Sequence, residues 1–326
     1  MSTHEKDTFF ATYDWAKSWQ DLPWSHDEAT LFLAEICARK PAGRALDIGC
    51  GAGTDSVFLA QQGWDVTALD FMPKALEFTK QRAAAENVSV TAVEADIAEW
   101  EPPHTYDLVL DHGLLHNMDP MRHAAYRACI LKALAPRGDF ILLHWHPRYP
   151  DQPDGKMGPR RVSREDIKTF FAPELQERFF AREEFEDLTS QVGGGMVQAY
   201  YWFRVNQAHA DPAGLLRQIE STLQTNKVDF AAALTAAGDQ PLSSTVTDAE
   251  LAVILGPGRL GVCHVDPAED QVAGVLELLA HNAGVEKIYL ENLLRLFADA
   301  ERANICTRDA RCGVCKVRYC KRLRQR

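Results

Sequence analysis

Short apolar runs alternate with amphipathic stretches through the first two-thirds of the chain. The apolar runs predict strands at 44–47, 64–70, 89–96, 106–111, 139–146, 175–182 and 196–205. Helical periodicity predicts helices at 54–60, 73–86 and 120–131. Because strands and helices alternate, we expect an α/β fold whose mainly parallel sheet is covered on both faces.

Cap and breaker residues refine this pattern. The sequence Ser-His-Asp-Glu at 25–28 is typical of a capping box and predicts a helix from there to about residue 38. A second Ser-Arg-Glu-Asp cap at 163–166 predicts another helix. Between them, the proline-rich stretch 147–162 predicts a long loop, which in a compact domain is usually functional or disordered.

The strand pattern stops near residue 208 and amphipathic helical patterns replace it. They predict helices at 212–224, 227–237, 247–255, 267–282 and 284–302, with a loop or brief strand at 257–264. We therefore expect three parts. They are an α/β domain at 1–207, an all-α domain at 208–303 and a cysteine-rich basic tail at 304–326.

The first strand ends in Asp47 and then enters a turn with glycine at alternate positions, Gly49, Gly51 and Gly53. Glycine permits positive φ and a close approach of backbone N–H groups to a ligand. The spacing is G-x-G-x-G, whereas a dinucleotide site requires G-x-G-x-x-G. This turn therefore disfavours a pyrophosphate cradle, and Asp47 would meet a ligand amine or hydroxyl through water.

Acids also end the next three predicted strands. Asp70 follows Gly49 by 21 residues, the place of a carboxylate that accepts from both ribose hydroxyls. Phe71 is expected against an adenine face, and Asp96 is placed to accept from an adenine amino group beside Ile97. With Asp111 closing the fourth strand, the strand ends predict a nucleoside pocket.

This set of strand ends resembles the class I S-adenosylmethionine-dependent methyltransferases over roughly residues 9–206. The resemblance implies a Rossmann-like sheet of seven strands, with the last two antiparallel, and S-adenosylmethionine as cofactor. It implies these cofactor-binding residues: Trp24, Asp47, Gly49, Cys50, Gly51, Gly53, Asp70, Phe71, Asp96, Ile97 and Asp111.

Within that class, the chain is most similar to the small thiol and metalloid methyltransferases of the thiopurine and tellurite type. Three fragments carry this similarity: the aromatic stretch 9–24, the segment Asp-His-Gly-Leu-Leu-His at 111–116, and Gly-Pro-Arg-Arg-Val-Ser at 158–163. The implied acceptor is a small thiol, selenium or metalloid compound. His112 and Leu114 depart from what relatives often have, so the family substrate is not carried over.

The candidate catalytic residues are His112, His116 and Arg160. A soft thiolate or selenolate needs little base catalysis, and the two histidines are the candidate bases and orienting groups. The alternative is that His116 is satisfied by backbone, and that Arg160 or its neighbour Arg161 is a solvated loop residue rather than an anion clamp. Similarly, the aromatic stretch 9–24 forms either a lid over the cofactor or an ordinary core flap.

Four cysteines crowd into the tail: Cys306, Cys312, Cys315 and Cys320. Four thiolates at this spacing can surround one ion, with zinc as the first choice and an iron–sulfur cluster as the second. The site would be a structural staple, a docking module for RNA or another macromolecule, or a trap for a thiophilic substrate.

Net charge is unevenly distributed. Residues 302–326 carry nine basic side chains and one acidic one, a net +8, whereas the whole chain carries −11 and the remainder therefore −19. An acidic body argues against long nucleic-acid contacts, but a basic tail can bind phosphate. The alternative is a solvated charged end.

No apolar run is long enough for a membrane helix, and the polar first residues lack a signal-peptide core. We expect a cytoplasmic protein with no membrane partner. The leading hypothesis is a small-molecule methyltransferase. The alternatives are an RNA or protein methyltransferase that docks its substrate through the tail, and a sensor that binds cofactor or metal without turnover.

Overall fold

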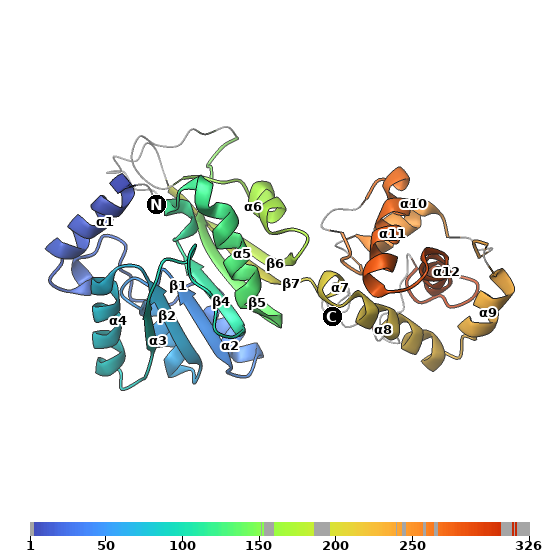
Figure 1. Ribbon diagram of the computed structural model, residues 1–326, viewed down its shortest axis with the longest axis horizontal. Coiled ribbons are helices and arrows are strands. Elements are labelled where there is room, and N and C mark those ends of the chain that lie inside the picture. Colours follow the sequence, from blue (N-terminus) through green and yellow to red (C-terminus); the bar gives the residue numbers. More distant parts are fainter. Residues whose placement is uncertain are drawn as a thin grey trace. The chain divides into compact units, whose positions relative to one another are not determined.

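The predicted strands form one sheet of seven strands in the computed structural model, in the order β3-β2-β1-β4-β5-β7-β6 (Figure 1). The structure describes residues 3–150, 152, 160–185, 196–238, 240–242, 246–256, 259–263, 267–307, 315 and 317. The strands are β1 Arg44–Ile48, β2 Asp65–Asp70, β3 Thr91–Glu94, β4 Tyr106–His112, β5 Leu134–Trp145, β6 Leu175–Phe185 and β7 Met196–Val205. The expected Rossmann-like arrangement is confirmed.

The first five strands are parallel, and β7 lies antiparallel to β5. The helices of this part are α1 Thr3–Trp15, α2 Leu33–Arg39, α3 Thr54–Gln61, α4 Pro73–Ala85, α5 His123–Ala133 and α6 Arg164–Phe171. Short 3-10 turns lie at η1 Trp19–Asp21, η2 Leu115–Asn117 and η3 Pro120–Arg122.

Alternate residues of β5 pack against opposite layers. Ile141 belongs to a core that includes Leu33 of α2 and Leu59 of α3. Its neighbour Phe140 instead contacts the ring of Phe171 in α6 at a centroid distance of 5.2 Å. Because successive strand residues face opposite sides, helices cover both faces of the sheet, as the alternating pattern predicts.

The start that the 25–28 capping box predicts for this helix is wrong, and only its later part forms, as α2. Residues 25–32 form turns, and α2 begins only at Leu33, after Phe32 with a φ of +76°. The competing interaction is tertiary: Asp55 accepts the backbone N–H of Thr30 at 2.6 Å and its hydroxyl at 2.7 Å. This segment therefore bends around Asp55 instead of forming a helical turn.

The chain divides into two compact units, one comprising Met1–Phe171 with Glu177–Val205, the other Ala172–Gln176 with Asn206–Arg326. The described helices of the second unit are α7 Gln207–Ala210, α8 Pro212–Thr225, α9 Phe230–Ala237, α10 Asp248–Leu255, η4 Glu269–Gln271, α11 Val272–Ala283 and α12 Lys287–Ala298. Residues 259–263, expected as loop or brief strand, form turns.

The second unit has its own apolar core. Fully buried leucines of α8, α10 and α12, among them Leu215, Leu251 and Leu293, belong to one cluster. Several predicted helix boundaries move. The α9 helix begins at Phe230 because the Asp229 side chain caps it, accepting from Ala232 N at 3.0 Å. The α11 helix begins at Val272, and α12 begins at Lys287 and ends at Ala298. No helix in the described part of the chain is long and apolar enough to cross a membrane.

Candidate functional site

Carboxylates line the edge of the sheet where the parallel strands end. Asp47, Asp70 and Asp111 are buried at the ends of β1, β2 and β4, and Asp96 follows β3. Neighbouring parallel strands end at the same edge, so the predicted acids lie in one region.

The turn after β1 has the backbone that its glycines predict. The φ angles of Gly49, Gly51 and Gly53 are +63°, +55° and +78°. At Gly53 a Cβ would lie only 2.6 Å from Thr79 Oγ1, and the same hydroxyl donates to the Gly51 carbonyl at 3.0 Å. The glycine turn is therefore packed directly against α4.

Asp70 fastens the turn to the end of β2. Its carboxylate accepts the backbone N–H groups of Gly51 and Met72, each at 2.9 Å. Burial raises the pKa of Asp70 to about 6, although these N–H groups pull it in the opposite direction. A buried carboxylate in this position suits a ligand that brings hydroxyl donors.

A pocket opens beside this carboxylate. Five of the predicted cofactor residues line it together with five others; the lining is Gly49, Leu69, Asp70, Phe71, Ala95, Asp96, Ile97, Leu114, Met118 and Arg122. Asp96 already forms an ion pair with Arg122, 2.8 Å between Oδ2 and Nη1, and its Oδ1 accepts from Ala98 N at 3.2 Å. Its expected role toward an adenine amino group stays a prediction.

Aromatic side chains from the N-terminal segment pack on the rim. Phe9 contacts the rings of Trp24 and Phe71 at centroid distances of 5.4 and 6.4 Å, and Tyr13 contacts Trp24 at 5.6 Å. A Cβ on Gly51 would lie 3.6 Å from the Tyr13 hydroxyl and 4.0 Å from Trp24 Nε1. The flap therefore belongs both to a small core and to the wall of the cofactor turn.

Two predicted residues at the turn already have protein partners. Asp47 accepts the hydroxyl of Ser56 at 2.5 Å, and burial, followed by the charge of Asp55, raises the pKa of Asp47 to about 7. The backbone N–H of Cys50 donates to the Leu69 carbonyl at 3.1 Å, and burial raises the pKa of its thiol. Cys50 therefore shapes the turn through its backbone.

Asp111 organises the loop after β4. It accepts the N–H groups of Leu114 and Leu115 at 2.6 and 3.1 Å and the hydroxyl of Tyr126 at 2.5 Å. Burial raises the pKa of Asp111 to about 6. Its three donors all come from the protein, so its direct role is to hold the loop that carries Leu114 into the pocket.

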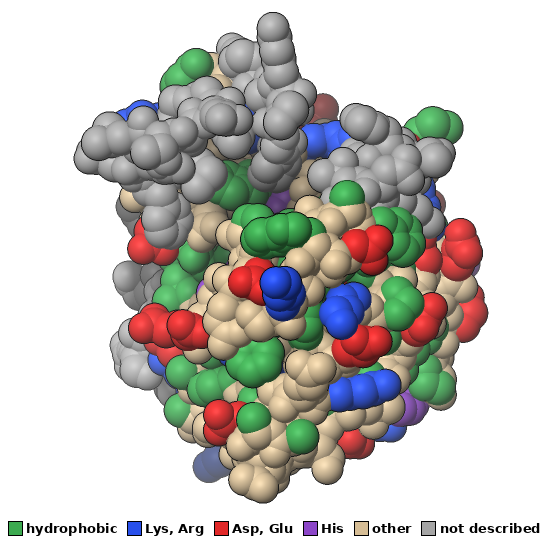
Figure 2. Space-filling view, turned by 90° about the vertical axis from the view of Figure 1, so that its left-hand side faces the viewer, with side chains coloured by type: hydrophobic (Ala, Val, Ile, Leu, Met, Phe, Trp, Pro, Cys, Tyr) green, Lys and Arg blue, Asp and Glu red, His purple; other side chains and the backbone are tan. Residues whose placement is uncertain are grey.

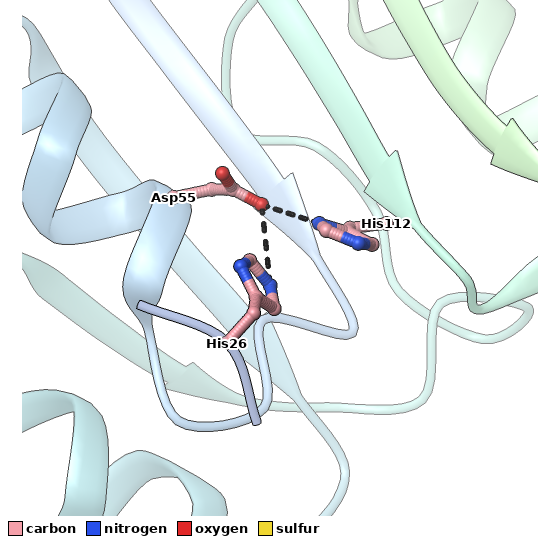
Figure 3. Close-up of side chains that lie close together, drawn as sticks. All are labelled: His26, Asp55 and His112. Atoms are coloured by element: carbon pink, nitrogen blue, oxygen red, sulfur yellow. Dashed lines mark hydrogen bonds and ion pairs between the residues drawn. The ribbon is translucent and has the colours of Figure 1, made fainter. Parts of the chain in front are cut away.

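A polar cluster lies next to the glycine turn. The Oδ2 atom of Asp55, in the first turn of α3, is 2.8 Å from Nδ1 of His112. His26 Nε2 is 4.0 Å from the same oxygen, and the two imidazole rings lie 4.2 Å apart between centroids. Figure 3 shows both rings turned toward Asp55.

Burial and charge act in opposition in this cluster. Burial opposes the charged forms of both groups, but Asp55 and His112 stabilise each other, which lowers the pKa of Asp55 and raises that of His112. Burial lowers the pKa of His26, and its neighbour His112 adds to this effect. Asp55 therefore stays ionised beside His112 near neutral pH.

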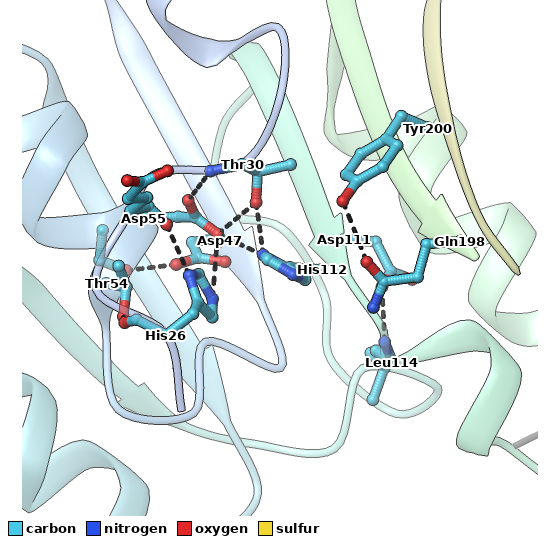
Figure 4. A network of polar contacts seen from close by, with 12 residues as sticks. His26, Thr30, Asp47, Thr54, Asp55, Asp111, His112, Leu114, Gln198 and Tyr200 are labelled. Carbon is cyan, nitrogen blue, oxygen red and sulfur yellow. Dashed lines mark hydrogen bonds and ion pairs between the residues drawn. The ribbon is translucent and has the colours of Figure 1, made fainter. Parts of the chain in front are cut away.

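Side chains from β7 lie on the other side of His112 in the view of Figure 4. The Tyr200 hydroxyl donates to Gln198 Oε1 at 3.0 Å. Burial, the Glu183 carboxylate and then the charge of Asp55 raise the pKa of Tyr200 to about 12. In that view His112 is drawn between Asp55 and these two side chains of β7.

The other two candidate catalytic residues occupy different surroundings. His116 is buried, with its ring 5.4 Å from that of His144, and burial holds its pKa well below the usual range. In the described residues its Nδ1 has no hydrogen-bond partner, so the alternative of a backbone-satisfied His116 side chain finds no support at that atom. Arg160 donates its side chain to the Met118 carbonyl and its backbone N–H to the His116 carbonyl, the latter at 3.1 Å.

Half of the cysteine cluster lies in the described part of the second unit. Cys306 is buried in the core and Cys315 packs against it. The backbone N–H of Val317 points to Cys315 Sγ at 3.4 Å, and Arg259 Nη1 is 3.8 Å from Cys306 Sγ. Cys312 and Cys320 lie outside the described residues, so the four-cysteine site stays a prediction.

Four site residues escaped the sequence reasoning: His26, Thr30, Asp55 and Tyr200. An acid in the first turn of a helix is typical of a residue that stabilises the helix end, so its position alone does not indicate a functional role for Asp55. His26 lies where the sequence predicts the start of a helix that in fact begins at Leu33, and Tyr200 lies on a strand predicted only for its apolar pattern. The one feature of the sequence that points to this cluster is the position of Asp55, two residues after Gly53 of the glycine turn.

The part of the chain that contains the glycine turn is similar to known methyltransferases. Residues 45–138, which contain β1–β4 and the turn, match the model of a methyltransferase domain. Thiocyanate methyltransferase 1 of Brassica oleracea is 30% identical over 135 residues, 40% of this chain and 60% of that protein. Probable thiol methyltransferase 2 of Arabidopsis thaliana is 31% identical over the same length and shares.

The chain therefore spans about 60% of the length of these curated relatives. Among solved structures, the 1,6-didemethyltoxoflavin-N1-methyltransferase of Burkholderia thailandensis, with bound 1,6-didemethyltoxoflavin and S-adenosylhomocysteine, is similar with a TM-score of 0.47 at 21% identity. The match covers 62% of this chain and 87% of that one.

Proposed function

We propose that this protein is an S-adenosylmethionine-dependent methyltransferase that acts on a small nucleophile, with a thiol, selenium or metalloid compound as the acceptor. The observation that carries the proposal is the buried Asp70 carboxylate, which binds the glycine turn at Gly51 N and lines a pocket beside it.

The residues present fit the nucleoside of that cofactor. Asp70 provides an acceptor for two ribose hydroxyls, and Phe71 and Ile97 provide apolar walls for a base. Gly49 and Gly51 leave the space that a Cβ would fill near Leu114 and Tyr13. We place the amino-acid end of the cofactor toward Asp47, because a cation or amine would offset the negative charge there.

When bound, S-adenosylmethionine supplies an electrophilic methyl group on a sulfonium sulfur. The work of the protein is then to align an acceptor and to remove its proton. His112 is the group best placed for this. With its Nδ1–H donated to Asp55, its Nε2 is left as the proton acceptor, and Asp55 fixes this tautomer.

A soft acceptor fits the site better than a macromolecule does. Soft thiolates are already partly ionised near neutral pH and need only modest help from a base. The names of the two plant relatives, a thiocyanate and a thiol methyltransferase, support the same class of acceptor.

Purified protein should transfer label from methyl-tritiated S-adenosylmethionine to hydrosulfide, thiocyanate or a small aryl thiol. We expect product in the volatile or solvent-extractable fraction, and none with Asp70→Ala. Binding of S-adenosylhomocysteine without transfer to any acceptor of this panel would contradict the acceptor class. Such a result would favour a sensor that binds the cofactor without turnover, or an acceptor of another chemical class.

A second candidate is an RNA or protein methyltransferase. The observation in its favour is the net +8 of residues 302–326. On the face of the first unit seen in Figure 2, by contrast, basic and acidic side chains are interspersed among the described residues. The tail would then have to supply docking, and its removal should weaken RNA binding in a salt-dependent way.

We also propose a zinc ion at the four cysteines of the tail, with an iron–sulfur cluster as the second choice. The placement of Cys306 and Cys315 at one core, with a backbone N–H directed at Cys315 Sγ, supports it. Metal analysis should find less zinc per chain in a Cys312→Ser, Cys320→Ser variant than in the wild type, and an unchanged amount in Cys129→Ser. Equal metal content in all three proteins would contradict the site.

A further inference from the structure

His26, Asp55 and His112 form a cluster outside the lining of the nucleoside pocket. One ligand atom from each, two imidazole nitrogens and one carboxylate oxygen, lie within 4.8 Å of one another. The closest pair, His112 Nδ1 and Asp55 Oδ2, is 2.8 Å apart, and His26 Nε2 lies 4.0 Å from Asp55 Oδ2. Ligands about 2.0–2.2 Å from a tetrahedral metal lie roughly 3.4 Å from one another, so these two distances differ from that spacing by about 0.6 Å each.

The Thr30 hydroxyl contacts two of the candidate ligand atoms, Asp55 Oδ2 at 2.7 Å and His112 Nδ1, and would have to turn away when an ion binds, whereas the other hydrogen bonds orient the cluster. His26 Nδ1 lies 2.6 Å from the Glu28 carbonyl oxygen and donates its N–H there, so Nε2 carries the lone pair that faces Asp55. Asp55 is oriented by the N–H and hydroxyl of Thr30. Metal-binding histidines and carboxylates typically have such outer partners.

Exposure also suits an ion that arrives from solvent. The Asp55 side chain is 4% exposed, whereas those of His26 and His112 are 33% and 23% exposed. The carboxylate is thus buried while both imidazoles reach the surface. Three protein ligands would leave a coordination position open on that side.

The local charge favours a cation. Asp47, Asp55 and Asp111 all end or follow adjacent strands and are buried, and no described lysine or arginine forms an ion pair with Asp55. Neutral or singly protonated histidines offset this negative charge only in part.

We propose that His26 Nε2, Asp55 Oδ2 and His112 Nδ1 bind a divalent transition-metal ion, with zinc as the first choice. Two imidazoles favour zinc and its neighbours over magnesium or calcium, which prefer oxygen ligands. The ion takes the place of the proton between His112 and Asp55, and that proton passes to solvent on binding.

A role for the ion in methyl transfer rests on the proposed function. The open position would hold a soft anion such as the acceptor thiolate, whose own proton is then lost to solvent instead of to His112 Nε2. The cluster would thereby select acceptors that bind metals, such as thiols and selenols, over alcohols and amines.

Titration of the full chain with Co²⁺ tests the site by its visible spectrum. A cobalt ion held by two histidines and a carboxylate gives d–d bands without the thiolate-to-metal charge transfer that the tail cysteines would give. We expect both kinds of band in the wild type. His26→Ala and Asp55→Asn should weaken the thiolate-free class at least tenfold, and the exposed His104→Ala should leave it unchanged.

Unfolding of a variant is checked by thermal melting, with His26→Gln as a second, less disruptive change. The proposal is overturned if the wild type shows only thiolate-bound cobalt, or if a folded His26 variant titrates like the wild type. Calorimetry with S-adenosylhomocysteine on the same samples separates this result from the proposed function. If the wild type binds cobalt at this cluster but does not bind S-adenosylhomocysteine, the methyltransferase proposal is refuted and the metal-site proposal is not.

Discussion

The Asp70 carboxylate accepts the backbone N–H of Gly51 at 2.9 Å and so joins the end of β2 to the turn after β1. The carboxylate and the turn belong to the ends of two different strands, and this hydrogen bond joins them beside one pocket. A carboxylate buried in this way would bind ribose hydroxyls and keep the turn in shape at the same time.

Replacing Asp70 by Ala removes the acceptor for both ribose hydroxyls. Each hydrogen bond to a charged group contributes about 1.5–3 kcal/mol, so we expect affinity for S-adenosylhomocysteine to fall at least 100-fold in calorimetry. Asp65→Ala, at the exposed start of the same strand, is the matched control and should bind normally. Unchanged affinity in the Asp70 variant would show that the pocket is assigned wrongly.

Cofactor affinity should depend on pH because burial raises the pKa of Asp70 to about 6. The ionised form accepts from two hydroxyls, so binding is strongest above this pKa. Below it the carboxyl must first lose its proton, and affinity falls by up to about tenfold per pH unit. Asp70→Asn should bind weakly with a flat profile between pH 7 and 5. A wild-type profile that is equally flat would contradict this account.

Asp55→Asn should impair turnover far more than cofactor binding. The amide cannot fix the His112 tautomer as the carboxylate does, and it is a poor metal ligand, so kcat should fall about 10²-fold or more. S-adenosylhomocysteine affinity should change less than threefold, because Asp55 does not line the pocket. Asp27→Asn, exposed and nearby, controls for the charge change. Full activity in Asp55→Asn would remove the cluster from the mechanism.

Two glycines with the same backbone conformation should respond differently to alanine. Gly53 and Gly63 have φ angles of +78° and +85°, but only at Gly53 would the new Cβ meet Thr79, at 2.6 Å. Positive φ costs alanine about 1–2 kcal/mol, and overpacking adds about 1–3 kcal/mol. In urea denaturation, Gly53→Ala should lower the free energy of unfolding by about 3 kcal/mol or more, and Gly63→Ala by about half of that. Equal losses would argue against close packing of the turn.

The sheet edge could be predicted because local signals and tertiary structure agree there. Asp47, Asp70 and Asp111 each follow an apolar run, and parallel strands bring their ends together. The order of strands beyond the turn followed from the family resemblance. The helices after residue 208 could also be predicted, because their apolar residues recur every three to four positions.

The acceptor side could not be predicted, because it depends on contacts between distant segments. The capping sequence at 25–28 is a valid local signal, yet Thr30 gives its N–H to Asp55, which lies 25 residues further along. This tertiary contact takes the place of the first turns of the predicted helix, and His26 lies beside His112 in the same cluster. Tyr200 reaches the site from β7, whose pairing with β5 no short stretch of sequence specifies.

The most direct test of the central claim is methyl transfer from tritiated S-adenosylmethionine into a cell lysate, with label counted in volatile, small soluble and acid-precipitable fractions. The account predicts label in the volatile or small soluble fraction, lost with Asp70→Ala and retained with Asp65→Ala. Label that appears only in the precipitate, and disappears when residues 306–326 are removed, would contradict it. Such a result would make a macromolecule the substrate.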